Sequence, residues 1–243
     1  MKKTKKTKPK TKKKEIKKVI KKPTTKSVQS VLTTKVQDTN YWINRPILDK
    51  EKDWKYDEPT WIDGYVLSVK HPHRELILET LKKVEPFGAL LEVGCSVGPN
   101  LVKIEAVYPE KQLAGIDVRE ELIVKAQELL PKPIFKIGSV LSIPFEDKGF
   151  DVVLVDAVLM YIGPKEIEQA LSELNRVASK AIILVERLTK KTEMAGHVWG
   201  HNYPELLGKL GFQVEVRRLD ENSWPDSPNW QKYGAIIVAS RPA

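Results

Sequence analysis

Short apolar runs alternate with helical segments from about residue 72 to the end of the chain, and this alternation constrains the fold more than any other feature. Runs that are apolar at nearly every position are typical of strands buried on both faces. Strands that alternate with helices pair in parallel, because each helix returns the chain to the same edge of the sheet. We therefore predict an α/β fold with a doubly wound, mostly parallel, seven-stranded sheet and helices on both faces.

The expected strands cover residues 89–94, 112–118, 133–140, 150–162, 180–187, 213–219 and 234–240. The expected helices cover residues 71–88, 99–109, 120–130, 165–178 and 203–212. In the first of these helices, Leu76, Ile77, Leu81 and Val84 recur at the spacing of one helix face, and Pro86 ends the pattern. The order of elements is Rossmann-like.

Positive charge is concentrated at the N-terminus. Residues 1–26 hold 14 lysines and one acid, Glu15, whereas the rest of the chain holds 27 basic and 31 acidic residues. Such a segment buries too little apolar surface to offset the entropy of ordering, so residues 1–37 are expected to form a disordered basic tail and linker. The tail is either a solubilising arm or an electrostatic contact to nucleic acid or another polyanion.

The residues between this tail and the expected sheet are rich in aromatic rings, among them Trp42, Trp54, Trp61 and Tyr65. Large apolar rings are uncommon in disordered linkers. Residues 38–71 are therefore expected to form an N-terminal extension that packs on a main domain of residues 72–243. The extension either braces this domain or covers part of a ligand site.

The composition of the chain predicts the cellular compartment in which it is found. No run of about 18 apolar residues occurs, so no membrane span is predicted. The basic N-terminus lacks the apolar stretch of a secretory signal. The chain has one cysteine, which excludes an internal disulfide and fits a reducing environment. A cytoplasmic location is expected.

The stretch LLEVGCSVGPNL, residues 90–101, joins the first strand to the helix behind it. In a doubly wound sheet the ligand lies beyond the carboxyl ends of the strands, usually at such a turn. Gly94 and Gly98 allow the backbone to bend sharply and to approach a ligand closely. The following helix then points free N–H groups at the ligand. An ordinary tight turn that binds nothing is the alternative.

The second strand ends at Asp117, 19 residues beyond Gly98. An acidic side chain at this position is placed to accept hydrogen bonds from the vicinal hydroxyls of a ribose. The dinucleotide pattern G-x-G-x-x-G fits poorly, because Ser96 and Pro99 stand where its second and third glycines belong. Together with Glu92, this spacing favours a ligand that has a ribose and an amino-acid ammonium group.

Four segments together resemble the class I S-adenosylmethionine-dependent methyltransferases: residues 90–101, LAGIDV at 113–118, residues 138–162 and the final pair of strands. The resemblance covers about residues 72 to 240 and implies S-adenosyl-L-methionine as the cofactor. The cofactor-binding residues that it implies are Glu92, Gly94, Cys95, Ser96, Gly98, Asn100, Asp117, Val118, Ser139, Val140, Asp156 and Ala157.

The resemblance also implies a role for each part of this set. The loop from Glu92 to Gly98 holds the methionine portion, and Asp117 binds the ribose hydroxyls. Val118, Ser139 and Val140 surround the adenine, while Asp156 and Ala157 lie beside the reactive sulfur.

Two positions depart from the pattern of this family. Ser96 replaces the glycine at the middle of the loop, and Ser139 stands where many members place an acid. Backbone contact would have to replace that acid in recognising the adenine amine. Cys95 is expected to be a small residue in the loop rather than a nucleophile.

Three residues are candidates for catalytic work: His197 and His201 after the fifth strand, and Tyr161 after the fourth. Methyl transfer from a sulfonium needs mainly orientation and a water-poor site, and a base is needed only where the acceptor must lose a proton. The two histidines are spaced i, i+4, but the neighbouring glycines and the lack of an obvious third ligand argue against a metal pair. No metal site is expected.

His71 and His73 flank Pro72 at the start of the first expected helix. We expect them to cap the helix or to pack in the loop before it.

The leading hypothesis is a methyltransferase that uses S-adenosyl-L-methionine to methylate an O or N atom of a small or medium-sized acceptor. One alternative is an RNA- or protein-directed methyltransferase that captures its substrate with the basic tail. Another is a non-catalytic cofactor-binding scaffold, since a fold does not fix a function. The spacing of the glycine loop disfavours a nicotinamide-dependent oxidoreductase.

Overall fold

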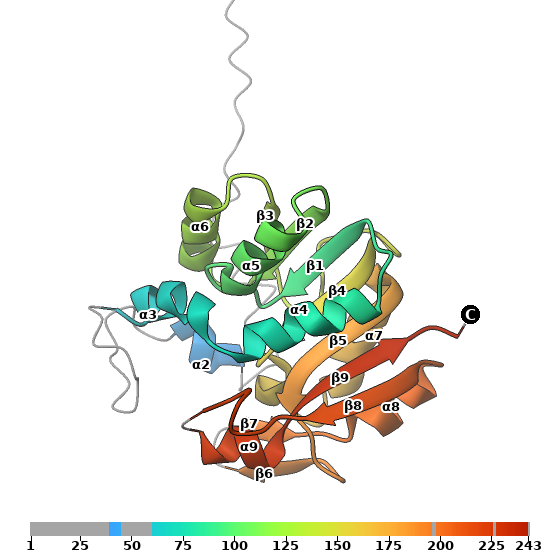
Figure 1. The fold of residues 1–243 in the computed structure, drawn as a ribbon. Helices are drawn as coiled ribbons and strands as arrows, with labels where there is room; N and C mark the ends of the chain where they lie inside the picture. The colour runs from blue at the N-terminus through green and yellow to red at the C-terminus, as the bar shows by residue number, and fades with distance from the viewer. Residues whose placement is uncertain (1–38, 45–59, 196–197, 226, 243) are drawn as a thin grey trace, which may run out of the picture. The chain divides into compact units, whose positions relative to one another are not determined.

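The central sheet has seven strands in the order β3-β2-β1-β4-β5-β9-β8. The computed structural model describes residues 39–44, 60–195, 198–225 and 227–242 (Figure 1). The strands are β1 Ala89–Val93, β2 Gln112–Asp117, β3 Ile134–Ile137, β4 Phe150–Asp156, β5 Ala178–Arg187, β8 Gln213–Arg218 and β9 Gly234–Ser240. The predicted fold class is confirmed.

The strand order of the sheet reverses between β1 and β4: β2 and β3 lie on one side of β1, and β4 and β5 lie on the other. β1 pairs in parallel with β2 on one side and with β4 on the other. Neighbouring loops leave opposite faces of the sheet at such a point, and ligands bind there in doubly wound folds. β9 is the exception to the parallel arrangement, because it runs antiparallel to both β5 and β8.

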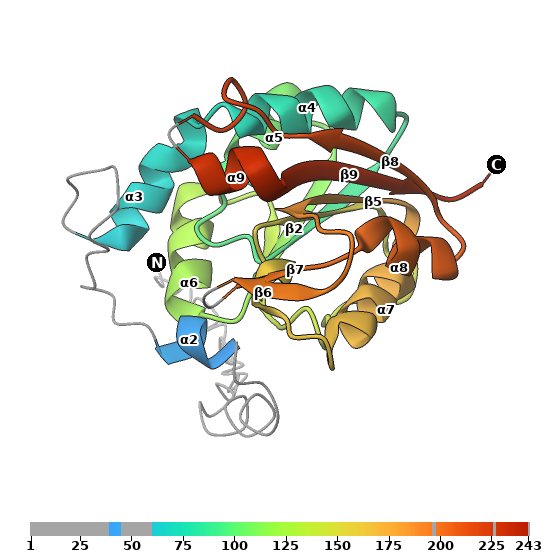
Figure 2. The same ribbon diagram turned by 90° about the horizontal axis from the view of Figure 1, so that it is seen from below.

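Helices cover both faces of the sheet (Figures 1 and 2). One face carries α4 His73–Lys83, α5 Pro99–Val107 and α6 Glu120–Leu129, and the other carries α7 Ile167–Val177 and α8 Tyr203–Lys209. Leu81 and Leu101 pack with Leu90 in one core cluster, whereas Leu171 packs with Leu91 in the other. Since neighbouring strand residues point to opposite faces, each buried strand supplies both clusters.

Several short elements were not predicted. They are α2 Thr39–Asn44, α3 Trp61–Leu67, the 3-10 helices η1 Ser68–Lys70 and η2 Leu159–Tyr161, the hairpin strands β6 Glu193–Ala195 and β7 Val198–Gly200, and α9 Pro228–Tyr233. Ile62, Tyr65 and Val66 of α3 pack against Val97 and Leu122. This part of the aromatic-rich segment therefore contacts the main domain beside the glycine loop. The predicted basic tail lies outside the described residues.

The predicted strand over residues 150–162 is too long, because β4 ends at Asp156 and η2 follows. The fully buried carboxylate of Glu186, on β5, explains this break. Its Oε1 accepts hydrogen bonds from the backbone N–H groups of Val158 and Leu159, both at 2.7 Å, and its Oε2 accepts one from Met160 at 3.1 Å. A side-chain acceptor that satisfies the free N–H groups of a helical turn ends the strand at this point.

No helix within the described ranges combines the length and the apolar composition of a membrane span.

Candidate functional site

The loop between β1 and α5 is built from left-handed backbone and is anchored to β2. The backbone N–H groups of Gly94 and Cys95 both donate to the carbonyl oxygen of Ile116 at 2.8 Å. The φ angles of Gly94, Ser96 and Gly98 are 75°, 51° and 81°. Gly94 and Gly98 adopt this conformation without steric cost, whereas a serine pays about 1–2 kcal/mol for it. The two glycines predicted from the sequence are therefore required by the backbone of this loop.

Asp117, at the end of β2, fixes the middle of the loop. Its Oδ2 accepts a hydrogen bond from the backbone N–H of Ser96 at 3.0 Å, and its Oδ1 accepts one from Arg119 at 3.0 Å. Burial raises the pKa of Asp117 to about 6, and these backbone donors oppose that rise. Asp117 therefore holds the glycine loop, in addition to the ribose contact that the resemblance implies.

A buried hydrogen-bond network joins β1, α5 and β4 at the point where the sheet order reverses. The side-chain amide of Asn100 donates to Glu92 Oε1 at 2.7 Å and to Asp156 Oδ2 at 3.0 Å. Glu92 is only 2% exposed. Within the described part of the chain, Glu92 Oε2 and Asp156 Oδ1 are buried and have no hydrogen-bond partner. A buried carboxylate oxygen without a donor is costly, so these two oxygens indicate where a ligand with N–H or O–H groups belongs.

Two residues at the start of α4 complete this network. His73 Nε2 lies 2.9 Å from Asp156 Oδ2. The guanidinium of Arg74 donates to Asn100 Oδ1 and, through Nε, to the carbonyl oxygen of Ser68 at 2.8 Å. The expectation that His73 caps or packs its helix is therefore incomplete, since its side chain binds the carboxylate at the end of β4.

The carboxyl groups of Glu92 and Asp156 differ in charge because their surroundings differ. Burial raises the pKa of Glu92 to about 8, although Asn100 opposes the rise. Burial also favours the neutral form of Asp156, but His73 and Arg74 outweigh it and hold the pKa of Asp156 below its usual range. At neutral pH, Glu92 is therefore mostly protonated and Asp156 is ionised.

The predicted adenine side is formed by residues that follow β2 and β3. The backbone N–H of Gly138 donates to the carbonyl oxygen of Asp117 at 2.9 Å, which brings the β3 loop to the end of β2. Ser139 is buried, and its hydroxyl accepts a hydrogen bond from the backbone N–H of Leu141 at 3.2 Å. Val118 is half-buried, and Val140 belongs to the core.

Two further residues of the predicted cofactor set are small and lie against the backbone. Cys95 is buried, and a Cβ added at Gly115 would lie 2.7 Å from its Sγ. Burial raises the pKa of the Cys95 thiol well above its ordinary value, so the group stays a thiol and not a nucleophilic thiolate. Ala157 has a φ of 57°, and its N–H donates to the carbonyl oxygen of Val185 at 2.9 Å.

The two described candidate catalytic residues, His201 and Tyr161, have different surroundings. His201 is fully buried, with Nε2 3.0 Å from the carbonyl oxygen of Ile162, and burial lowers its pKa. Tyr161 lies on η2, where its ring stacks at 6.4 Å on Tyr41 and meets Trp42 edge-on at 5.2 Å. His197 lies outside the described residues. Among the described side chains, no group of three or more His, Cys, Asp or Glu is arranged to hold a metal ion.

Sequence reasoning missed His73 and Arg74 because their roles depend on contacts over long sequence separations. The only local signal was a histidine and an arginine in the first turn of the helix that precedes β1. These two residues can be assigned to the site only when the structure shows that α4 begins beside the carboxyl end of β4.

The comparisons with known proteins agree with this geometry. Residues 91–185 match the model of a methyltransferase domain. An uncharacterised methyltransferase of Schizosaccharomyces pombe is 33% identical over 40% of this chain and 38% of its own length. Ajmaline N-methyltransferase of Rauvolfia serpentina is 28% identical over 52% of this chain and 45% of its own length. The chain thus spans less than half the length of these two curated relatives.

Solved structures share the fold over most of the chain. Magnesium protoporphyrin IX methyltransferase of Synechocystis PCC 6803, crystallised with S-adenosylmethionine, has a TM-score of 0.57 at 16% identity and covers 88% of this chain and 97% of its own. A protein of Pyrococcus horikoshii OT3 has a TM-score of 0.58 at 21% identity and covers 84% and 99%.

The close packing around Gly94 in the glycine loop can be tested by substitution. A Cβ at Gly94 would lie 2.2 Å from Val158 Cγ2, and the φ of 75° adds strain. We expect Gly94→Ala to lower the free energy of unfolding in urea by about 2–4 kcal/mol. Gly208→Ala is the matched control, because its Cβ meets nothing within 4 Å on α8, and it should raise that free energy by up to about 1 kcal/mol. Equal stability of the two variants would contradict this description of the loop.

Proposed function

We propose that this chain, which belongs to the class I S-adenosylmethionine-dependent methyltransferases, transfers a methyl group to an O or N atom of a small or medium-sized acceptor. The observation that carries the proposal is a pair of buried carboxylate oxygens beside the left-handed glycine loop, Glu92 Oε2 and Asp156 Oδ1, which have no hydrogen-bond partner in the described part of the chain.

The residues at the site fit S-adenosyl-L-methionine chemically. The cofactor carries an ammonium group, a sulfonium and a ribose with two hydroxyls, all of which interact favourably with carboxylates. Glu92, Asp117 and Asp156 come from three neighbouring strands of the sheet. The same carboxylates would repel the phosphates of a dinucleotide. We therefore assign the ammonium to Glu92 and the ribose to Asp117.

When bound, the cofactor supplies a methyl group that its positive sulfur has already activated. The chain then has to orient the acceptor and exclude water. We place Tyr161 on the acceptor side, together with the rings of Tyr41 and Trp42 on α2. His201 is assigned to the core, because its ring nitrogen is engaged by a buried carbonyl group, and His197 remains a candidate base.

A nitrogen acceptor is the better supported of the two alternatives. The relative from Rauvolfia serpentina is an N-methyltransferase, although it shares only part of its length with this chain. The ionised Asp156 also favours an acceptor that gains positive charge on methylation, as an amine does.

Calorimetric titration with S-adenosylhomocysteine tests the cofactor assignment, with NAD titrated in parallel. We expect binding of S-adenosylhomocysteine alone. Asp117→Ala should weaken it by about 1–3 kcal/mol, because charge-assisted hydrogen bonds to the ribose are lost. Asp147→Ala, which alters an exposed aspartate, is the control and should bind like the unmodified protein. Unchanged affinity in Asp117→Ala would refute the ribose assignment, and binding of NAD alone would refute the proposed function.

The lysine-rich N-terminus supports a second candidate, a methyltransferase that acts on RNA or protein. Fourteen lysines in residues 1–26 would bind a polyanion without sequence specificity. Deletion of residues 1–36 should then weaken methylation of RNA or of an acidic protein, with a loss that shrinks as salt is raised, and leave small-molecule turnover intact. Methylation of RNA and protein that is indifferent to the deletion would remove this role for the tail.

A further inference from the structure

Arg187, the last residue of β5, is a buried arginine whose charge is not neutralised by the chain. The residue is 9% exposed, and its Nε is buried. Within the described ranges, no hydrogen bond or ion pair joins its guanidinium to another residue. A guanidinium carries five N–H donors, and a buried charge without a partner is costly. These donors therefore indicate where an anionic ligand belongs.

The side chain of Arg187 contacts an aromatic ring from the start of the last strand. Its guanidinium carbon lies 5.4 Å from the centre of the Tyr233 ring, on α9. The backbone N–H of Leu188 donates to the carbonyl oxygen of Tyr233 at 2.8 Å, which joins the end of β5 to this ring. The face of a ring attracts the positive charge but gives its N–H groups no oxygen to bind. The contact thus holds the guanidinium and leaves its donors for a ligand.

The charges around Tyr233 are mostly positive. Lys232 Nζ lies 4.8 Å from the centre of the same ring, and Arg218 Nη1 donates to two backbone carbonyl oxygens at 2.9 and 3.1 Å. Glu186 precedes Arg187 but points to the opposite face, where its carboxylate accepts the N–H groups of η2. Glu193 on β6 offsets part of the charge of Lys232. This surrounding field favours an anion at Arg187.

The strand register places Arg187 on the same face of the sheet as Asp156. Asp156 pairs with Val185 in the parallel register of β4 and β5. Val185 packs in the core cluster beneath α4, and Arg187, two residues further along, points to the same face. At about 3.3 Å per residue and about 4.8 Å between strands, the α-carbons of Asp156 and Arg187 are about 8 Å apart. Arg187 therefore lies at the carboxyl end of the sheet, one strand away from Asp156.

Two tryptophans cover this face beside Arg187. Gly234 lies directly opposite Arg187 on β9, and a Cβ at Gly234 would lie 2.8 Å from Trp230 Cε3. Trp224 stacks on Trp230 with ring centroids 4.1 Å apart and planes inclined by 12°. The stacked pair is therefore an aromatic surface next to the guanidinium.

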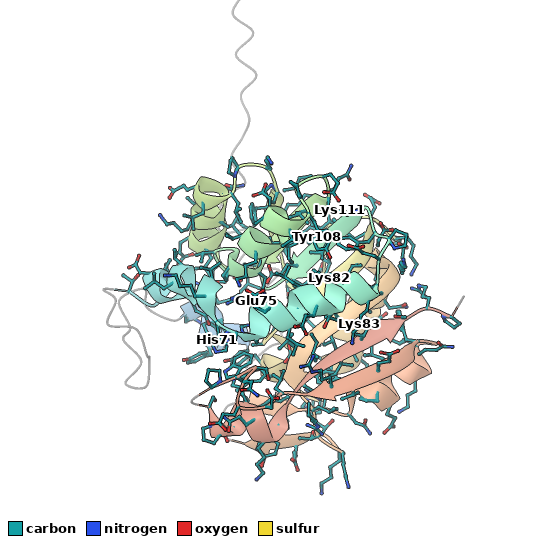
Figure 3. The ribbon with its side chains drawn as sticks, in the orientation of Figure 1. His71, Glu75, Lys82, Lys83, Tyr108 and Lys111 are labelled. Carbon is teal, nitrogen blue, oxygen red and sulfur yellow. The ribbon has the colours of Figure 1, made fainter. Side chains whose placement is uncertain are left out.

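The same aromatic pair reaches the start of α4. The Trp224 ring stacks on His73 at 4.4 Å, and His73 Nε2 lies 2.9 Å from Asp156 Oδ2. His71, which Figure 3 shows at the N-terminal end of α4, has its ring 4.8 Å from that of Trp224. The tryptophans thus connect the surroundings of Asp156 with those of Arg187.

We propose that Arg187 binds a carboxylate of the methyl acceptor and so determines which acceptors the site takes. The inference rests on the proposed function and names the acceptor as a molecule that carries a carboxylate besides the O or N atom that is methylated. The two oxygens of a carboxylate match two N–H donors of the planar guanidinium, and one negative charge neutralises it. The tryptophan pair offers a flat apolar surface to the rest of such a molecule.

Benzoate and benzamide are the first probes, because they share a shape and differ in charge. Ligand-observed NMR titrations of the full chain saturated with S-adenosylhomocysteine give their dissociation constants. We expect benzoate to bind at least about tenfold more tightly than benzamide, since a charge-assisted pair contributes about that factor. Every variant keeps the lysine-rich N-terminus, so binding of benzoate to that segment is common to all of them.

Two variants of Arg187 and one control separate charge from structure. Arg187→Met should abolish most of the preference for benzoate, and Arg187→Lys, which keeps the charge but not the planar donors, should retain part of it. Arg217→Met alters an exposed arginine of β8 and should bind like the unmodified protein. All three should keep their affinity for S-adenosylhomocysteine within about threefold. Arg187→Met should not lower the midpoint of thermal unfolding, because it removes a buried charge without a partner.

A second pair of probes tests whether this carboxylate belongs to the acceptor. They are conjugates in which nitrogen replaces the sulfonium of S-adenosylmethionine and a carboxyalkyl chain, in a series of graded length, replaces the transferred methyl group. Each conjugate is compared with its neutral carboxamide. We expect one chain length at which the carboxylate binds at least about tenfold more tightly than the carboxamide, and Arg187→Met should remove this difference.

Each contrary outcome overturns a defined part of the inference. Equal binding of benzoate and benzamide, or a preference that survives in Arg187→Met, would refute the carboxylate site. A preference for benzoate without any preference among the conjugates would leave an anion site that is separate from the acceptor. A lower midpoint of thermal unfolding in Arg187→Met would assign this arginine to the stability of the fold. Failure to bind S-adenosylhomocysteine would contradict the proposed function itself, whereas the comparison of benzoate with benzamide on the free protein would still decide the carboxylate site.

Discussion

The side-chain amide of Asn100 is the contact on which the site depends, because it joins the buried carboxyl groups of two neighbouring strands. It donates to Glu92 on β1 and to Asp156 on β4, and its oxygen accepts from Arg74. These strands meet where the order of the sheet reverses, so the amide bridges the two halves of the fold. A buried network of this kind is stable only when its members are satisfied. We therefore assign to the ligand the two oxygens of this network that have no donor among the described residues.

The different surroundings of the two carboxylates give them different tasks. Glu92 lies deep at the end of β1, where burial keeps it mostly protonated until a cation arrives. Asp156 ends β4, where the donors of α4 and α5 keep it ionised. In the function that we propose, Glu92 loses its proton when the ligand binds, whereas Asp156 is charged beforehand. Preorganised charge of the second kind is what a site needs where positive charge grows during a reaction.

Most of the correct predictions from the sequence rested on the spacing of residues that are close together in the chain. Gly94, Gly98 and Asp117 were identifiable because a strand, a turn and a helix of this kind leave a local pattern. His73, Trp224 and Glu186 could not be assigned in the same way, since each acts on a segment far away in the chain. His201 shows the converse limit: its position after β5 made it a candidate for catalytic work, whereas the fold buries its ring against the carbonyl oxygen of Ile162. Burial of a polar side chain is a property of the packed fold and has no local signature.

The number of protons released when S-adenosylhomocysteine binds is the most direct test of this account. A free Glu92 with a pKa of about 8 is mostly protonated at pH 7, and an ammonium beside it lowers that pKa, so binding must expel a proton. Calorimetry at pH 7 in buffers of different ionisation enthalpy should show the release of close to one proton, and Glu92→Gln should abolish it. Affinity should rise with pH towards 8. Binding without proton release in the unmodified protein would contradict the assignment of the ammonium to Glu92.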